Sequence, residues 1–212
     1  MITGIILTNN SERVLVRSLT CLRKFDEIIV YDTGSIDGTL ELARSFGVRV
    51  EQGEGIKSFA ETRNKAAALS SNDFVFFLDS DEFIDWRAYD ELAVLFTARS
   101  DVVVGFKRLN MYDLKNYVVS WYPDVQFRAY NRKEHEYYRD VDCLLRYKQG
   151  QERESTYHLW HNLFLDRKRY EENKIRAGVL AGRVVTPDEA RQFVDFNLNR
   201  PRKPVLELGA VE

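Results

Sequence analysis

The feature that most constrains the fold is the alternation of short apolar runs with helical patterns through the first hundred residues. The expected strands are 4–8, 27–31, 48–51 and 74–78, and the expected helices are 11–22 (with Ser11 as N-cap), 39–46 and 59–69. Strands joined by helices predict a mainly parallel α/β sheet that is covered by helices on both faces.

Polar residues follow three of these strands at the point where each strand ends. They are Thr8-Asn9-Asn10, Asp32 and Asp79-Ser80-Asp81. Because parallel strands bring their carboxyl ends to one edge of a sheet, we expect a single polar rim there. A strand-end aspartate is also typical of a helix cap or a turn, so Asp32 taken alone has both interpretations.

The stretch "FVFFLDSDEF" places Asp79 and Asp81 close together after a buried strand. Adjacent carboxylates raise each other's pKa unless a cation lies between them, and hard oxygen ligands suit Mg²⁺ or Mn²⁺. The pattern favours a metal or nucleotide site, and a solvated turn before the next helix is the alternative.

Composition narrows the classes of function. A net charge of −2 gives no general positive field that would hold nucleic acid, and no apolar run approaches the roughly 20 residues that span a bilayer. Cys21 and Cys143 lie far apart and show no metal-type spacing, which indicates free thiols in a reducing compartment. We therefore expect a soluble, cytoplasmic protein.

Four segments in order carry a resemblance to a known family. They are "ILTNNSE", "DEIIVYDTGSIDGTLELARSFG", "GIKSFAETRNKAA" and "DFVFFLDSDE", which together cover about Ile5 to Glu82. The chain resembles the inverting family 2 glycosyltransferases with the GT-A fold, and most of all the branch of lipopolysaccharide-core and capsular-glycan transferases. A weaker resemblance is to the amino-terminal domain of chlorovirus enzymes that glycosylate a capsid protein.

The resemblance implies an organisation in two halves. Residues 1–198 would form the GT-A domain, with a nucleotide-binding half at 1–100 and a smaller acceptor-side β/α half at 101–198. Residues 199–212 contain two prolines and no expected closing element, and we interpret them as a linker or a truncated tail of a longer protein. A last helix is expected from Pro187 to Phe196, with Thr186 at its start.

The resemblance also implies contacts with a UDP-linked donor. Asp32 would accept the imide N–H of uracil, while Thr8 and Asn10 would flank the base and the ribose. Arg63 would hold the base edge or a phosphate oxygen through its planar guanidinium. Asp79 and Ser80 would complete the nucleotide contacts.

The implied metal site consists of Asp81, Asp79 and His161. Asp81 would bind Mn²⁺ or Mg²⁺, which offsets the charge developing on the departing diphosphate. Asp79 would lie near the ribose or a water on the metal, and His161 would be a third ligand or a diphosphate contact. His161, Asp166 and Lys174 follow the order seen in relatives; His135, which stands in a charged run, is expected to be exposed.

Two departures from the family pattern bear on activity. Relatives usually show Asn-Glu-Glu after the first strand, where this chain has Asn10-Ser11-Glu12. The His-Glu element that follows a later strand in the family is also missing, so we assign the catalytic base to Asp142, with Asp140 second; both would point to the same side of a strand.

The sequence thus predicts an inverting, metal-dependent glycosyltransferase. It would move a hexose or deoxyhexose, such as glucose or rhamnose, from a UDP-sugar to a hydroxyl of a glycan acceptor. Two alternatives stay open: a non-catalytic nucleotide- or sugar-binding module, and a nucleotidyltransferase that makes nucleotide sugars. A dinucleotide oxidoreductase is disfavoured, because the first strand is followed by Thr8-Asn9-Asn10-Ser11 and not by a glycine-rich turn.

Overall fold

The computed structural model describes residues 1–111, 116–118, 122–141, 143–162, 171, 186–198 and 202–204, and at 116–118, 193–198 and 202–204 the backbone alone. The elements are β1 Ile2–Thr8, α1 Leu15–Cys21, β2 Glu27–Asp32, α2 Thr39–Ser45, β3 Arg49–Gln52, α3 Phe59–Ala68, β4 Phe74–Asp79, β5 Glu82–Ile84, α4 Ala88–Ala98, β6 Val103–Met111, β7 Asn116–Val118, β8 Asp124–Asn131, β9 Tyr137–Tyr138, β10 Leu144–Leu145, β11 Glu152–Asn162, α6 Pro187–Leu198 and β12 Arg202–Pro204. The chain divides into two compact units, Met1–Lys107 with Val125–Leu159 and Arg108–Asp124 with Trp160–Glu212.

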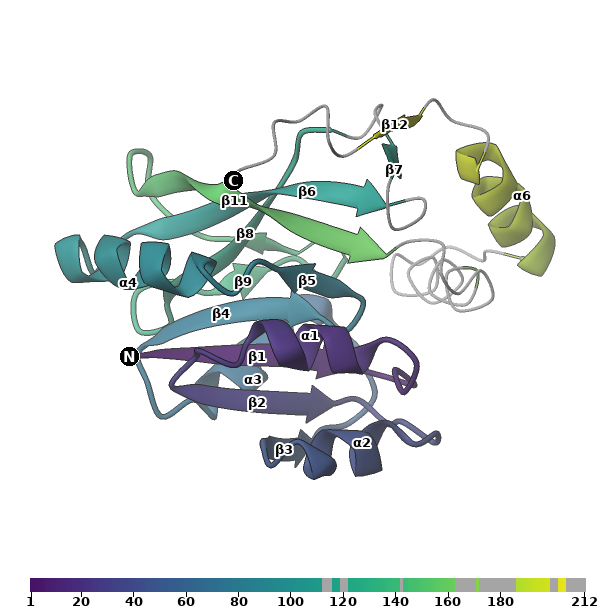
Figure 1. Cartoon of the computed structure of the whole chain (residues 1–212), viewed down its shortest axis with the longest axis horizontal. Helices are drawn as coiled ribbons and strands as arrows, with labels where there is room; N and C mark the ends of the chain where they lie inside the picture. The colour runs from purple at the N-terminus through teal and green to yellow at the C-terminus, as the bar shows by residue number, and fades with distance from the viewer. Residues whose placement is uncertain are drawn as a thin grey trace. The chain divides into compact units, whose positions relative to one another are not determined.

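The first unit is built on a sheet in the order β6-β8-β4-β1-β2-β3 (Figure 1). β1 pairs in parallel with both β2 and β4, and β2 pairs in parallel with β3, as the alternating pattern predicts. β8 joins β4 antiparallel, so the sheet becomes mixed where the second half of the chain is added.

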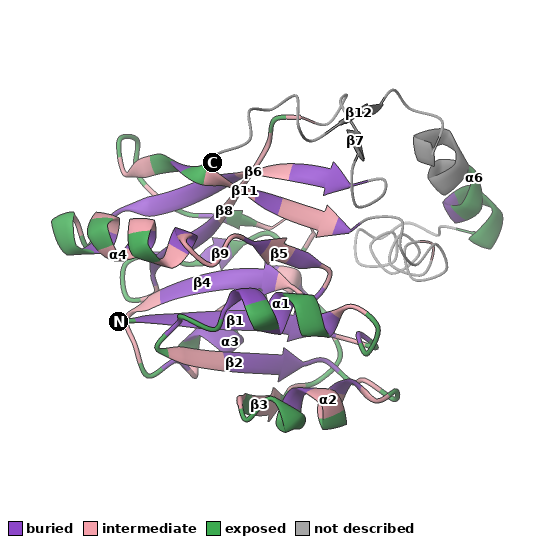
Figure 2. Cartoon of the chain, viewed as in Figure 1, coloured by how far each residue is buried: buried purple, intermediate pink, exposed green. Residues whose placement is uncertain are grey.

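Alternate residues of the central strands feed two separate cores. Ile2 and Ile6 of β1 face the cluster that contains α1 and α4, while Ile5 and Leu7 face the cluster that contains α3. Figure 2 shows β1 and most of β4 as buried. Because each fully buried isoleucine contributes about 1.5–3 kcal/mol, the two-residue period fixes the register of these strands and hence the place of their ends.

Helix α1 begins later than predicted. The helix expected from Ser11 starts at Leu15, and residues 12–14 form a turn in which the N–H groups of Val14 and Leu15 both donate to the Ser11 carbonyl, each at 3.0 Å. The N-cap residue, Val14, makes no side-chain capping hydrogen bond. The Ser11 hydroxyl is used elsewhere, against Ser80, so it does not cap the helix.

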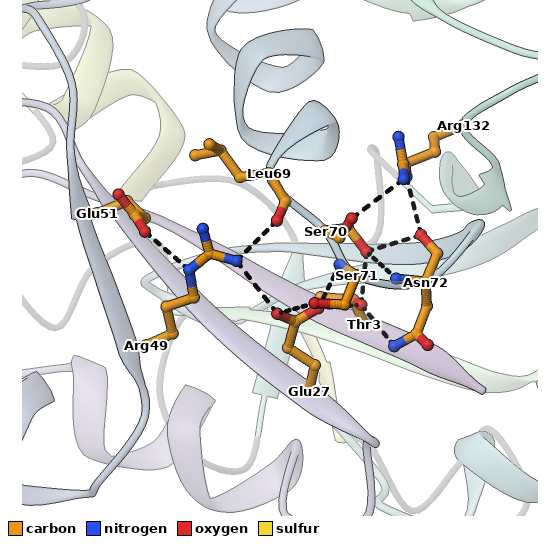
Figure 3. A network of polar contacts seen from close by, with 9 residues as sticks. All are labelled: Thr3, Glu27, Arg49, Glu51, Leu69, Ser70, Ser71, Asn72 and Arg132. Atoms are coloured by element: carbon orange, nitrogen blue, oxygen red, sulfur yellow. Dashed lines mark hydrogen bonds and ion pairs between the residues drawn. The ribbon is translucent and has the colours of Figure 1, made fainter.

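Polar side chains hold together the amino-terminal edge of the parallel strands (Figure 3). The Glu27 carboxylate accepts hydrogen bonds from Thr3 Oγ1 at 2.8 Å, from the Ser71 N–H at 2.8 Å and from Ser71 Oγ at 3.0 Å. Arg49 Nη1 donates to Glu27 Oε1 at 3.4 Å and to the Leu69 carbonyl at 2.8 Å. Burial on its own raises the pKa of Glu27, but these donors bring it below its usual value.

The same edge is closed by Ser70, Asn72 and Arg132. Ser70 Oγ and Asn72 Nδ2 donate to Thr3 Oγ1 at 2.6 and 3.0 Å, and Arg132 donates to the carbonyls of Asn72 and Ser70. We call this set the Glu27 clamp: Thr3, Glu27, Arg49, Leu69, Ser70, Ser71, Asn72 and Arg132. It ties β1, β2 and β3 to the turn between α3 and β4.

The second unit contains the end of β6, which pairs with β7 through Met111 and Tyr117, and β12, which pairs with β7. β12 lies at residues 202–204, in the segment for which the sequence predicts no regular element. Helix α6 starts as predicted at Thr186-Pro187, with a capping box in which Thr186 Oγ1 accepts from the Glu189 N–H at 3.2 Å and Glu189 Oε2 accepts from the Thr186 N–H at 2.8 Å. None of the helices within the described residues is long and apolar enough to cross a bilayer.

Candidate active site

The predicted polar rim is present at the carboxyl edge of β1, β2 and β4. Thr8 pairs with Asp32 across β1 and β2, and Leu7 pairs with Asp79 across β1 and β4. Three strand ends therefore stop within one residue of the same level. This alignment follows from the parallel register and brings three loops of distant sequence to one edge.

Asp32 is fully buried and organises the loop that follows β2. Its Oδ1 accepts from Thr8 Oγ1 at 3.0 Å and from Ser35 Oγ at 2.5 Å, and its Oδ2 accepts from the N–H groups of Gly34 at 3.0 Å and Ser35 at 2.9 Å. A carboxylate offers about four lone-pair positions, and all of them are used here. Gly34 has φ +104°, a conformation that side chains strongly disfavour, so glycine lets the loop turn back onto Asp32.

Asn10 and Glu12 tie the loop after β1 to the loop after β2. Asn10 has φ +50°, its Oδ1 accepts from the Ile36 N–H at 2.9 Å, and its own N–H donates to Ser35 Oγ at 2.8 Å. Glu12 Oε2 accepts from the Gly38 N–H at 3.2 Å. Asn10 remains exposed at the rim, and Glu12 occupies a structural position beside it.

Ser80, between the two aspartates of the D-x-D motif, is buried and held by two serines. Its hydroxyl lies 2.7 Å from Ser11 Oγ, and its carbonyl accepts from Ser18 Oγ at 2.9 Å. Ser18 Oγ also lies 2.6 Å from the Glu82 carbonyl. Ser11, the residue that departs from the family pattern, thus supports this loop from inside.

Asp79 lies between two arginines that come from different elements. Arg63 Nη2 of α3 donates to Asp79 Oδ1 at 2.6 Å, and Arg128 Nη2 of β8 donates to Asp79 Oδ2 at 3.0 Å. Arg128 Nη2 also donates to Glu82 Oε1 at 2.7 Å, and Glu82 Oε2 accepts from the Asp79 N–H at 3.0 Å. The four side chains carry two positive and two negative charges, so the cluster is electrically balanced.

Both guanidiniums are held in the charged state. Burial opposes their charge, but Asp79, joined by Glu82 for Arg128, keeps the pKa of each arginine above its usual value. Arg63 also lies over the rings of Phe77 and Tyr137, at 5.5 and 5.3 Å from the ring centroids. Arg63 is predicted to contact the nucleotide; the structure places it 5% exposed beneath Asp79.

Asp81 is half-buried at the rim, two residues beyond Asp79. Within the described ranges no group of three or more His, Cys, Asp or Glu side chains lies together in a metal-binding arrangement. The predicted third ligand, His161, belongs to the second unit, where its Nδ1 lies 2.8 Å from Asn110 Oδ1. A divalent cation at the rim would take its protein ligand from Asp81.

The residues predicted as catalytic base follow β9. Asp140 is exposed, and its carbonyl accepts from the Phe59 N–H at 3.0 Å, which places this loop against the start of α3. Asp142, Asp166 and Lys174 lie outside the described residues.

His135, expected to be exposed, is 7% exposed. Its ring nitrogens lie 3.2 and 3.0 Å from the carbonyls of Arg146 and Asp101, so two separate backbone segments cover it.

Glu82 and Arg128 are not among the site residues predicted from the sequence. Two signals point to them. Glu82 is the last acid of "DSDE", and Arg128 interrupts the apolar strand run Phe127-Arg128-Ala129-Tyr130. A charged residue inside a buried strand requires a partner, and the partner here is 46 residues away in sequence.

Known proteins share both the sequence family and the fold. A family model described as glycosyl transferase family 2 matches residues 3–183. An uncharacterized glycosyltransferase of Rickettsia typhi is 30% identical over 105 residues, which cover 47% of this chain and 34% of that protein. The lipopolysaccharide core biosynthesis glycosyltransferase LpsC of Rhizobium meliloti is 29% identical over 113 residues, covering 50% of this chain and 40% of that protein. The matched part is thus two fifths or less of these relatives' length.

The structural comparison agrees with the predicted fold class. The crystal structure of TarS residues 1–349 from S. aureus superposes with a TM-score of 0.55 at 16% identity, covering 93% of this chain and 69% of that chain. At this identity the likeness concerns the fold, and it confirms the predicted GT-A type of α/β architecture.

Proposed function

Since the chain belongs to glycosyl transferase family 2, we propose that it moves a sugar from a UDP-sugar to a hydroxyl group of a glycan acceptor, with inversion and with a divalent cation held by Asp81. The observation that carries this proposal is the rim itself. Thr8, Asp32 and Asp79 stand within one residue of the same level, and Asp81 lies half-buried two residues beyond Asp79. The sugar would be a hexose or deoxyhexose, such as glucose or rhamnose.

The loop built on Asp32 would form the floor of the uracil pocket. TarS, which shares the fold, has been crystallised with UDP and with UDP-GlcNAc. All lone-pair positions of Asp32 are already occupied, so a direct bond to the uracil imide requires the hydroxyl of Thr8 or Ser35 to rotate away. Asn10, exposed beside this loop, would flank the ribose.

A Mn²⁺ or Mg²⁺ ion would stabilise the negative charge of the departing diphosphate. Asp81 provides a hard oxygen ligand, and phosphate oxygens with water would complete the coordination. Asp79 contributes less negative charge to such an ion, because two guanidiniums already hold its oxygens.

On the acceptor side, a carboxylate must remove the proton from the attacking hydroxyl opposite the leaving diphosphate. We propose Asp142 for this role, with Asp140 as the second candidate. The reaction would serve the synthesis of surface or structural glycoproteins or polysaccharides. Since the match covers two fifths or less of these relatives, we also propose that the chain works together with further domains.

Calorimetric titration of UDP and GDP, with Mn²⁺ and with EDTA, tests the donor site. We expect metal-dependent UDP binding that weakens by more than about 100-fold in Asp81→Ala, because even residues behind the metal ligands change metal affinity 10- to 100-fold. Asp90→Ala is the matched control, since it removes an exposed aspartate of α4 that pairs with Lys24. Absence of nucleotide binding under every condition contradicts the proposal.

Release of UDP from UDP-sugars separates an enzyme from a pure binding module. A catalyst hydrolyses the donor slowly with Mn²⁺ even without acceptor, whereas a binding module leaves it intact. Intact donor after prolonged incubation, together with tight UDP binding, would favour the module.

A further inference from the structure

Glu82 occupies an unusual place for a carboxylate. It is fully buried, yet it stands one residue after Asp81 at the rim. Its two oxygens serve different partners, the Arg128 guanidinium at 2.7 Å and the backbone N–H of Asp79 at 3.0 Å. One side chain therefore connects both ends of the D-x-D loop to strand β8.

Arg128 completes this connection from the other side. Its Nη2 donates both to Glu82 and to Asp79 Oδ2, and its side chain is 4% exposed. A buried guanidinium is tolerated only with charged partners, so these two carboxylates and Arg128 require one another. Arg63 adds the second positive charge that balances the cluster.

The consequence is a loop in which Asp79, Ser80 and Glu82, the residues on either side of Asp81, are each held by buried partners. Asp79 is held by its side chain and its N–H, Ser80 by Ser11 and Ser18, and Glu82 by Arg128. These hydrogen bonds fix the backbone on both sides of Asp81. Neither Glu82 nor Arg128 is exposed enough to reach a ligand itself.

We infer that Glu82 and Arg128 are positioning residues of the metal–nucleotide site, which set the direction of the Asp81 carboxylate through the backbone of the Asp79–Glu82 loop. This inference rests on the proposed function. Asp81 would bind the metal, and the buried ion pair of Glu82 and Arg128 would fix the geometry of that binding.

The test is Glu82→Gln, which keeps the shape but turns one oxygen into an NH₂ group. Whichever way the amide lies, a donor then faces either Arg128 or the Asp79 N–H. We expect the Mn²⁺ affinity in the presence of UDP, measured by electron paramagnetic resonance of free Mn²⁺, to fall about 10- to 100-fold. Arg128→Lys, which keeps the charge but not the forked donor, should fall between this variant and the wild type.

The measurement is made well below each variant's melting temperature, so that folding does not enter. A purely structural role lowers the melting temperature but leaves the Mn²⁺ affinity of the folded protein unchanged, and that result overturns the inference. Asp90→Asn, an exposed carboxylate on α4, is the control. If Glu82→Gln does not fold, Glu82→Gln with Arg128→Gln removes one charge of each sign, leaves the Arg63–Asp79 pair balanced, and should show the same loss.

The wild type separates the two hypotheses. If it binds no Mn²⁺–UDP, the proposed function fails and the inference fails with it. If it binds Mn²⁺–UDP and the variants bind equally well, only the inference fails.

Discussion

Ser18 offers the sharpest test of how the D-x-D loop is held. Its hydroxyl is buried on α1 and lies 2.9 Å from the Ser80 carbonyl and 2.6 Å from the Glu82 carbonyl. Ser18→Ala removes a donor that serves both carbonyls. A buried hydrogen bond contributes about 1 kcal/mol, and withdrawing a donor from buried carbonyls adds a penalty of similar size, so we expect a loss of about 2 kcal/mol.

Urea unfolding followed by circular dichroism measures this loss, and a thermal scan should show a fall of about 4–8 °C for a chain of this size. Thr20→Ala is the matched control on the same helix. Thr20 Oγ1 donates to the Val16 carbonyl at 2.7 Å but is exposed, so its removal should change the free energy of unfolding by less than about 0.5 kcal/mol. Equal destabilisation of the two variants would falsify the claim that Ser18 supports the loop.

Three further outcomes are expected. Asp32→Asn turns an acceptor of the Gly34 and Ser35 N–H groups into a donor, so calorimetry should show UDP binding weakened by about tenfold or more. Gly34→Ala, at φ +104° with open space around it, should lower the free energy of unfolding by about 1–3 kcal/mol in urea, from backbone strain alone. The folded-state pKa of Glu27 lies below its ordinary value of 4.5. The contribution of this carboxylate to stability is therefore present above pH 4.5 and is lost as pH falls through the folded-state pKa. In urea unfolding from pH 6 to pH 3, the free energy of unfolding should decline less steeply for Glu27→Gln than for the wild type. An identical pH profile for that variant contradicts the assignment.

The rim was predictable because it follows from local patterns. Apolar runs that end in Thr8, Asp32 and Asp79 define strands, and parallel pairing brings their ends to one edge. The register of β1 with β2 and β4 confirms that expectation. Here the chain's local preferences and its tertiary pairing agree.

How deeply individual side chains are buried was harder to predict from the sequence. A helical position for Arg63 is visible in the pattern, but its burial is not. Its partner Asp79 is shared with Arg128, which is 65 residues further along the chain and reaches the same carboxylate from strand β8. His135 stands among charged residues and is nevertheless covered, because two distant backbone carbonyls meet its ring. In both cases the burial depends on contacts between residues far apart in the chain, and a single sequence gives little information about such contacts.

The Glu27 clamp has a consequence for how substitutions in this protein combine. It lies at the opposite end of β1 from the rim: Thr3 and Thr8 are five residues apart on one strand, or about 16 Å. Sites separated by more than about 10 Å without shared partners usually contribute additively to stability. The change in unfolding free energy from a stabilising substitution at Glu27, Ser71 or Arg49 should therefore add to that of a substitution at the rim. Such a substitution could restore the stability of a destabilised rim variant without changing the activity that is measured for it.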